Sequence, residues 1–403
     1  MDNQATNSKK KNANRPYSAK KQGKGNLCIY YKKCGGCQLQ NMSYEEQLSF
    51  KQAKCIKLLG KFCRVQEIIA MENPTHYRNK VQAAFGTTKG GKIISGVYQS
   101  SSHRIVCVDN CMIEDEIADA IIVSIRELIV KFKLRPYNED VGKGFLRHVL
   151  VRRGFKSGQV LVVLVTGSIV FPRKNDFIEQ LLKLHPEITS IVQNVNNRRT
   201  SLVLGETEKV LYGKGYIEDE LCGCVFRISP SAFYQINPVQ TEVLYNTAIE
   251  YAQLDETQTV IDAYCGVGTI GLVAAKKAKS VIGVELNPES VKNAKVNAKT
   301  NNAQNIRFVC ADSGEFMSNL AAQGECIDVL FTDPPRAGSD ERFLSCAVEL
   351  APKRIVYVSC NPETLARDLL YLVRHGYKVK KIQPVDMFPH TAHVECVVQL
   401  CLK

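Results

Sequence analysis

One cysteine stands directly after an apolar run that is typical of a buried strand. The run is Arg354–Ser359, and Cys360 follows it ahead of Asn361 and Pro362. Asn361 can cap a helix and Pro362 suits a first helical turn, so we expect the thiol beside a helix N-terminus, where the thiolate is favoured. A thiolate in that position could add to an electrophilic carbon. An inert core cysteine would explain the same position.

A lone carboxylate in the last apolar segment is the second group that could do chemistry. Glu395 lies near the start of His393–Leu400, and burying it within a strand is costly unless it has a role. If that strand is antiparallel to its neighbours, it begins at the edge where the strands before Cys360 and Asp333 end. Cys360, Glu395 and Asp333 are therefore expected to converge, and Glu395 could remove a proton there.

A glycine-containing loop follows the predicted strand Val260–Ala263. Gly266 and Gly268 in this loop let the backbone approach a ligand while the N–H groups of the next helix point at it. With Gly271 the loop also satisfies the dinucleotide pattern G-x-G-x-x-G, which is a weak match on its own. Glu285 ends the next strand, where a carboxylate can accept hydrogen bonds from both ribose hydroxyls of a nicotinamide cofactor or of S-adenosylmethionine.

Two further carboxylates favour S-adenosylmethionine over a nicotinamide cofactor. Asp312 follows the third strand, where it can reach an adenine amino group, and Asp333 with Pro334 and Pro335 ends the fourth strand, as in many methyltransferases. An aromatic residue after such an Asp-Pro-Pro run would suggest methylation of an amino group, but Arg336 stands there. Proline pairs also end strands for purely structural reasons.

The thiol and the carboxylate together fit methylation at C5 of uracil. Because C5 is a poor nucleophile, a thiolate must first add to C6, which turns the ring into an enolate whose C5 can attack a sulfonium methyl group. A carboxylate must then take the C5 proton so that the thiol can leave. RNA cytosine-5 methyltransferases carry a second cysteine after the fourth-strand proline, whereas Pro335 is followed here by Arg336, so uracil is favoured.

The regular alternation of strands and helices from about residue 237 predicts a parallel sheet with helices on both faces. The last two predicted strands have no helix between them, so they should form a hairpin whose final strand is antiparallel to the rest. The predicted strands are Val260–Ala263, Val281–Glu285, Ile306–Val309, Val329–Thr332, Ile355–Ser359, Lys378–Pro384 and His393–Leu400. Residues 229–403 are therefore expected to be an α/β, class I, Rossmann-like methyltransferase domain with seven strands.

Residues 75–228 show the shorter, turn-separated strands of an antiparallel-leaning α+β domain. The strands are predicted at Val81–Phe85, Ile93–Val97, Val149–Arg153, Val160–Val165, Ile191–Val195 and Leu202–Leu204. A basic stretch in this domain is the expected RNA contact, although a solvated strand face explains the same residues. The stretch consists of Lys143, Arg147, His148, Arg152, Arg153 and Lys156.

The charge of the chain predicts a polyanionic partner. The formal charge is +13 and the pI is near 9.0, and neutralising phosphates releases counterions, so RNA or DNA is expected, unless basicity only aids solubility. Residues 1–25 should form a disordered basic arm. No apolar run approaches the ~18–20 residues of a membrane helix, and no secretion signal is visible, so we expect a cytoplasmic protein without a membrane partner.

Several segments resemble the RNA uracil-5 methyltransferases, densely from about residue 226 onward. They are Ser229–Pro238, Asp333–Gly338, Ser359–Asp368 and His393–Cys396. The resemblance implies an S-adenosylmethionine-dependent enzyme with Cys360 as nucleophile and Glu395 as base. It also implies that Gln235, Tyr264, Glu285 and Asp333 contact the cofactor. Many relatives carry a small N-terminal β-barrel RNA-binding domain, which this sequence is expected to lack.

Residues 26–74 combine a cysteine group with a helix that should begin after the capping box of Ser43 and Glu46. The spacing of Cys28, Cys34 and Cys37, with a distant fourth cysteine, suits a [4Fe-4S] cluster, but zinc or no metal stays open. Ribosomal-RNA members of the family look similar here and hold such a cluster, whereas the typical tRNA member lacks it.

Physical reasoning leaves Cys107 and Cys111 equal as the fourth ligand, and the family's pattern favours Cys111. The resemblance thus implies an iron-sulfur-containing 23S ribosomal RNA (uracil-5-)-methyltransferase. A tRNA uracil-5 methyltransferase and a non-catalytic iron-sulfur RNA-binding or ribosome-assembly factor are the alternatives.

Overall fold

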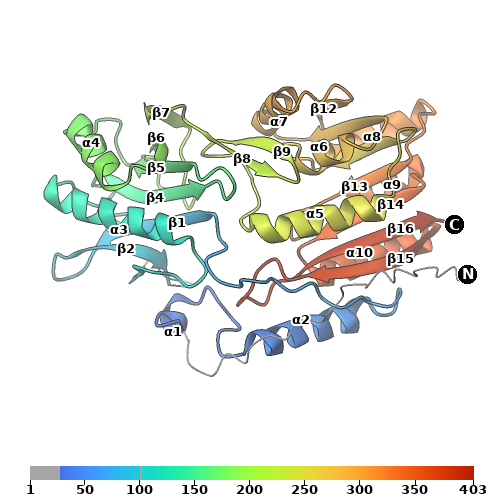
Figure 1. The fold of residues 1–403 in the computed structure, drawn as a ribbon, viewed down its shortest axis with the longest axis horizontal. Coiled ribbons are helices and arrows are strands. Elements are labelled where there is room, and N and C mark those ends of the chain that lie inside the picture. Colours follow the sequence, from blue (N-terminus) through green and yellow to red (C-terminus); the bar gives the residue numbers. More distant parts are fainter. Residues whose placement is uncertain (1–27, 100–101, 103) are drawn as a thin grey trace, which may run out of the picture.

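The computed structural model describes residues 28–99, 102 and 104–403, and Figure 1 shows two sheets side by side with α1 and α2 beneath them. The predicted arm of residues 1–25 lies outside the described residues. No helix in the described part of the chain is long and apolar enough to cross a membrane.

The central sheet has seven strands in the order β3-β2-β1-β4-β5-β6-β7. Its strands are β1 (Lys80–Thr87), β2 (Ile93–Tyr98), β3 (Ile105–Cys107), β4 (Leu146–Arg153), β5 (Val160–Thr166), β6 (Ile188–Val195) and β7 (Thr207–Tyr212). Every neighbouring pair is antiparallel except β5 and β6, which are parallel. Apolar side chains of α3 (Glu116–Lys131) and α4 (Lys174–Leu184) share a core with this sheet.

The second sheet has the order β12-β11-β10-β13-β14-β16-β15. Its strands are β10 (Thr259–Ala263), β11 (Ser280–Glu285), β12 (Ile306–Cys310), β13 (Val329–Thr332), β14 (Arg354–Ser359), β15 (Tyr377–Val385) and β16 (Glu395–Leu402). Strands β10 to β14 are parallel, and β16 alone is reversed, because it is antiparallel to both β14 and β15. This is the seven-stranded, Rossmann-like methyltransferase sheet with the antiparallel last strand that the sequence predicts.

Helices cover both faces of this sheet, because its strand residues alternate between two apolar cores. One core joins the sheet to α5 (Pro238–Ala252), α6 (Thr269–Ala275) and α7 (Pro288–Thr300). The other joins it to α8 (Ser313–Ala322), α9 (Glu341–Leu350), α10 (Pro362–Arg374) and α2 (Tyr44–Leu59). The first core continues into strands β4 to β6 of the central sheet, so the two sheets share apolar contacts.

The N-terminal segment packs along the second sheet. The predicted capping box is present, because Ser43 and Glu46 bond reciprocally at the start of α2. Farther along α2, the Lys51 ammonium forms a buried ion pair with Asp386 at 2.5 Å. Breaking a buried pair of this kind leaves an uncompensated charge, so α2 is firmly tied to the loop between β15 and β16.

One expectation about the central region was wrong. Leu202–Leu204 forms no strand, and the next strand is β7, which begins at Thr207. A short hairpin of β8 (Ile217–Leu221) and β9 (Cys224–Ile228) then follows, and side chains of α7 hold it, because Asn297 and Asn301 bond to its backbone. The sequence analysis did not predict this hairpin, although its strands alternate between buried and more exposed residues as a strand with one covered face does.

Most side chains of the basic stretch that is expected to contact RNA have partners within the protein. Arg147 is buried and makes a two-oxygen contact with Glu139, while Arg152 is buried and donates to the carbonyls of Pro230 and Ala232. Further along, Arg153 pairs with Asp115 at 2.7 Å. The remaining members are His148, which is buried, Lys156, which pairs with Glu220 and Glu242, and Lys143, which is exposed.

Candidate active site

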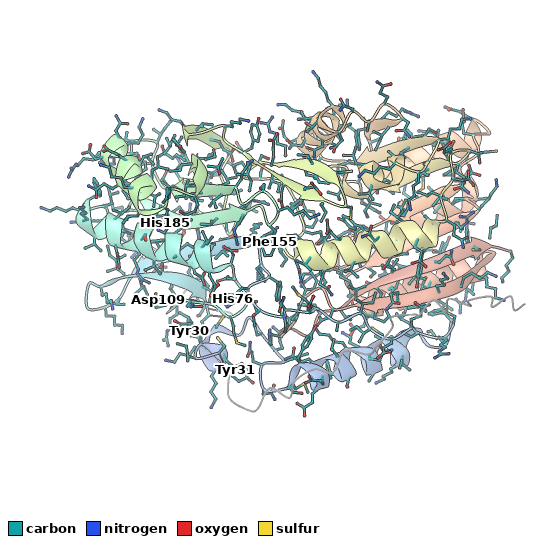
Figure 2. All side chains as sticks on the ribbon, viewed as in Figure 1. Tyr30, Tyr31, His76, Asp109, Phe155 and His185 are labelled. Atoms are coloured by element: carbon teal, nitrogen blue, oxygen red, sulfur yellow. The ribbon has the colours of Figure 1, made fainter. Side chains whose placement is uncertain are left out.

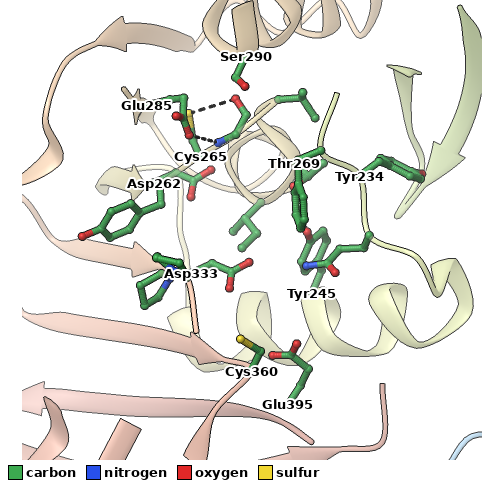
Figure 3. A pocket seen from close by; sticks show the side chains of 18 of the residues that line it. Tyr234, Tyr245, Asp262, Cys265, Thr269, Glu285, Ser290, Asp333, Cys360 and Glu395 are labelled. Atoms are coloured by element: carbon green, nitrogen blue, oxygen red, sulfur yellow. Dashed lines mark hydrogen bonds between the residues drawn. The ribbon is translucent and has the colours of Figure 1, made fainter. Parts of the chain in front are cut away.

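Three strand ends meet at one edge of the second sheet. Ser359, the last residue of β14, pairs with Cys396 on the reversed strand β16, so Cys360 and Glu395 extend the two strands at the same edge. Asp333 follows β13, the other neighbour of β14. All three side chains line a cavity of about 570 Å³, and Figure 3 shows Cys360 and Glu395 beside each other with Asp333 in the same cavity.

The cavity gathers six of the seven residues that the sequence predicts for catalysis and cofactor binding. They are Gln235, Tyr264, Glu285, Asp333, Cys360 and Glu395. Asp312 does not line the cavity; its carboxylate caps α8 by accepting a hydrogen bond from the backbone N–H of Glu315 at 2.9 Å. The structure therefore brings the thiol, the base candidate and four cofactor candidates together and leaves Asp312 outside.

One carboxyl oxygen of Glu395 has no hydrogen-bond partner among the described residues. Glu395 is 3 % exposed, and the oxygen without a partner, Oε2, is buried. Burial, and secondarily the nearby Asp333, raises the pKa of this carboxyl well above its usual range, while Arg336 opposes the shift. An unsatisfied buried oxygen costs free energy, which indicates that a ligand completes the site.

Cys360 follows the expected local geometry but not the expected ionisation. Asn361 caps α10 by accepting from the N–H of Glu363 at 3.1 Å, so the thiol does lie at a helix start. Burial and the carboxylates of Glu395 and Asp333 nevertheless raise the pKa of the Cys360 thiol to about 11, although Arg336 lowers it. Desolvation and two nearby acids outweigh the helix terminus, so the free site holds a thiol rather than a thiolate.

The other end of the cavity is built by the loop after β10. The N–H of Gly266 donates to Glu285 at 3.1 Å, and the second oxygen of Glu285 accepts from the N–H of Asn287 at 2.8 Å. Gly268 has a φ of +84°, and a Cβ atom there would lie 2.6 Å from the ring of Phe308. The glycine is therefore required for the backbone to turn tightly against β12, which leaves room above the loop for a ligand.

Sequence reasoning missed two polar residues of the cavity. Asp262 is buried in β10 and accepts from the N–H of Gly271 at 2.7 Å, and burial raises its pKa to about 7. Tyr245 of α5 lies beside Thr269, with 3.1 Å between their hydroxyl oxygens. Asp262 had a signal in the sequence, since it is a carboxylate within an otherwise apolar strand, as Glu395 is.

The four predicted cluster cysteines line a second cavity of about 540 Å³. Its lining includes Cys28, Cys34, Cys37 and Cys111. Cys107 does not line it, and its sulfur accepts a hydrogen bond from the Arg126 guanidinium at 3.4 Å. Within the described residues, no three His, Cys, Asp or Glu side chains are grouped closely enough to hold a metal ion. The structure therefore brings the four thiols to one cavity without grouping them as ligands of a single metal ion.

The family model described as tRNA (Uracil-5-)-methyltransferase matches residues 43–403. The chain belongs to this uracil-5-methyltransferase family. Membership makes it an RNA methyltransferase, and it agrees with the resemblance seen in the sequence.

Two similar proteins are RNA methyltransferases that carry the word uncharacterized in their names. The protein of Oceanobacillus iheyensis is 47% identical over 376 residues, which cover 92% of this chain and 82% of that protein. The protein of Clostridium acetobutylicum is 46% identical over 379 residues, with the same coverage of both.

Among solved structures, the fold is similar to Pyrococcus abyssi tRNA (uracil-54, C5)-methyltransferase in complex with S-adenosyl-L-homocysteine. The TM-score is 0.75 and the sequences are 31% identical, over 91% of this chain and 85% of that one.

The electrostatics of Cys360 predict how its reactivity depends on pH. Because only the thiolate reacts and its pKa is about 11, alkylation of Cys360 by iodoacetamide should rise about tenfold per pH unit from neutral pH upward. Arg336→Gln removes a charge that lowers this pKa, so it should slow alkylation at any pH below 11.

Peptide mass spectrometry can follow the Cys360 peptide alone, with the exposed Cys326 as an internal reference for the reagent. Alkylation that is independent of pH between about 6 and 8 would show a thiolate and contradict this account.

Proposed function

We propose that the protein methylates C5 of a uracil in RNA through a covalent adduct between Cys360 and C6, with Glu395 as the base. The observation that carries this proposal is the pairing of a thiol and an unpartnered buried carboxyl at the ends of β14 and β16, in one cavity. Family membership supplies the substrate class, since the matching family is one of uracil-5 methyltransferases.

The residues act in a fixed order. Cys360 releases its proton to solvent and its sulfur bonds to C6, so the electrons of the C5–C6 double bond move onto the uracil oxygen and C5 becomes nucleophilic. S-adenosylmethionine, when bound, supplies an electrophilic methyl group. Glu395 then takes the C5 proton, the C5–C6 double bond re-forms, and the bond between C6 and Cys360 breaks. The raised pKa of Glu395 suits a group that must accept a proton from carbon and pass it on.

We assign the cofactor to the cavity end lined by Gln235, Tyr264, Glu285 and Asp333. Glu285 stands at the end of β11, where it can accept hydrogen bonds from ribose hydroxyls. Asp333 follows β13, which lies between β11 and β14 in the sheet, and therefore stands between Glu285 and Cys360. The similar Pyrococcus abyssi enzyme is a complex with S-adenosyl-L-homocysteine, which supports the assignment. We also propose that Asp312 contacts the adenine amino group, and its place after β12 is the only support for this role.

Substitution of the two catalytic candidates should separate their roles. Cys360→Ala should abolish methyl transfer, because no covalent adduct can form. Glu395→Gln should form the adduct but not resolve it, so a protein–RNA band of reduced mobility should appear on a denaturing gel.

Cys401→Ala, at the far end of β16, is the matched control and should behave as the unaltered protein. An active Cys360→Ala protein would overturn the mechanism.

We propose 23S rRNA as the substrate and place RNA binding on the central region, residues 75–228. The support is the group of four cysteines in one cavity, since the ribosomal members resemble this chain there. A tRNA substrate is the second candidate, and a specific observation favours it: the similar solved structure is a tRNA enzyme.

Mapping 5-methyluridine in rRNA and tRNA from cells with and without the protein decides between them. A 5-methyluridine lost only from 23S rRNA is the expected result, and one lost only from tRNA would contradict it. No loss from either RNA would favour the third candidate, a non-catalytic RNA-binding factor.

We further propose that Cys28, Cys34, Cys37 and Cys111 hold a [4Fe-4S] cluster. Their shared cavity fits the proposal, and so does Gly36, where a Cβ atom would lie 3.3 Å from the sulfur of Cys34. Bound there, a cluster would cross-link residues 28–37 to the segment before α3 and stabilise both.

The protein purified without oxygen should be brown and hold about four irons per chain. Cys111→Ala should lose iron, whereas Cys107→Ala should retain it, because Cys107 lies outside the cavity. A colourless, zinc-containing and active protein would contradict the assignment.

A further inference from the structure

The cysteine cavity and the reaction cavity adjoin each other. Ile236 lines both of them. The backbone N–H of Asn79 donates to Ile236 at 2.9 Å, and its side chain donates to the carbonyl of Gln235 at 3.2 Å. The start of β1 is therefore fastened to the wall of the reaction cavity.

Two cationic side chains next to Asn79 line the cysteine cavity. Arg78 and Lys80 stand on either side of Asn79, and alternation along an extended chain places them, with Gln82, on one face. Within the described part of the chain neither cation forms an ion pair, and the Arg78 Nε atom is buried without a hydrogen-bond partner. Glu114 lines the same cavity near Arg78, and burial raises the pKa of its carboxyl.

The neighbouring strand adds to the positive charge. Lys80 is directly opposite Arg152 in the β1–β4 ladder, and Arg152 bonds only to carbonyl oxygens at Pro230 and Ala232 among the described residues. Like charges opposite each other destabilise a sheet. Burial, Arg152 and Arg78 lower the pKa of Lys80 to about 8. An anionic ligand would relieve the repulsion among these three cations.

We propose that Lys80 and Arg78 form a phosphodiester-binding subsite for the RNA strand next to the uridine in the reaction cavity. The inference rests on the proposed function, since it assumes that RNA enters that cavity. Two aromatic side chains support it, because Tyr30 and Tyr31 line the same cavity and can stack on bases. Figure 2 shows both beside α1 (Tyr31–Cys34), beneath the central sheet.

Lys80 is the better residue to test. Arg78 also acts electrostatically on Cys37 and Glu114, so replacing it would disturb the cysteines, whereas neither of those groups is affected by Lys80. The variants are Lys80→Gln, which removes the charge, and Lys80→Arg, which keeps it. Lys92→Gln is the control, since Lys92 is exposed just before β2 of the same sheet and the net charge changes equally.

Binding of unmodified 23S rRNA and tRNA transcripts should be measured against KCl concentration. Lys80→Gln should reduce the slope of log K against log salt by about one for the RNA that binds more tightly, because one phosphate contact is lost. Lys80→Arg and Lys92→Gln should keep the slope of the unaltered protein. An unchanged slope for Lys80→Gln, or equal losses in Lys80→Arg or Lys92→Gln, would overturn the inference.

Methyl transfer by the unaltered protein is measured on the same RNAs and tests the proposed function separately. Turnover with an unchanged Lys80→Gln slope refutes the subsite alone. A reduced slope without turnover refutes the proposed function and leaves Lys80 as an RNA-binding residue.

Discussion

The reversal of one strand is the constraint on which the site depends. Parallel strands deliver their following residues to one edge, so β13 and β14 bring Asp333 and Cys360 together, but another parallel strand would begin at the opposite edge. Because β16 is antiparallel, its first residue, Glu395, arrives beside Cys360. The loop from β15 to β16 must therefore be held in place, and buried bonds do this: Lys51 pairs with Asp386, and the Tyr77 hydroxyl donates to the carbonyl of Pro389.

Crowding acids around a thiol has an electrostatic consequence. Burial raises the pKa values of Cys360, Glu395 and Asp333 in the free protein, and nearby carboxylates raise those of Cys360 and Glu395 further. In the proposed mechanism the addition needs a thiolate and the later step needs a carboxylate, whereas burial favours the neutral form of both groups in the free protein. Arg336, which lines the same cavity, lowers the pKa values of both Cys360 and Glu395.

The sequence predicted the second sheet well because its strands are apolar runs with clear ends, and a polar residue directly after a strand marks the ligand edge. Cys360, Asp333 and Glu285 were found in this way. The sequence does not show side-chain partners that are distant in the chain: Arg152 donates to the carbonyls of Pro230 and Ala232, and Arg153 pairs with Asp115. Local patterns carry no information on such pairing, nor could they separate Cys107 from Cys111.

The cysteine segment is also joined to the loop that precedes Glu395. The backbone N–H of Leu39 donates to the carbonyl of His390 at 3.0 Å, and the N–H of Ala392 donates to the side chain of Gln38 at 3.2 Å. These residues follow Cys37 directly, so anything that fixes Cys37 also restrains the loop. The proposed cluster, if bound by these cysteines, would therefore also restrain the loop that brings Glu395 beside Cys360.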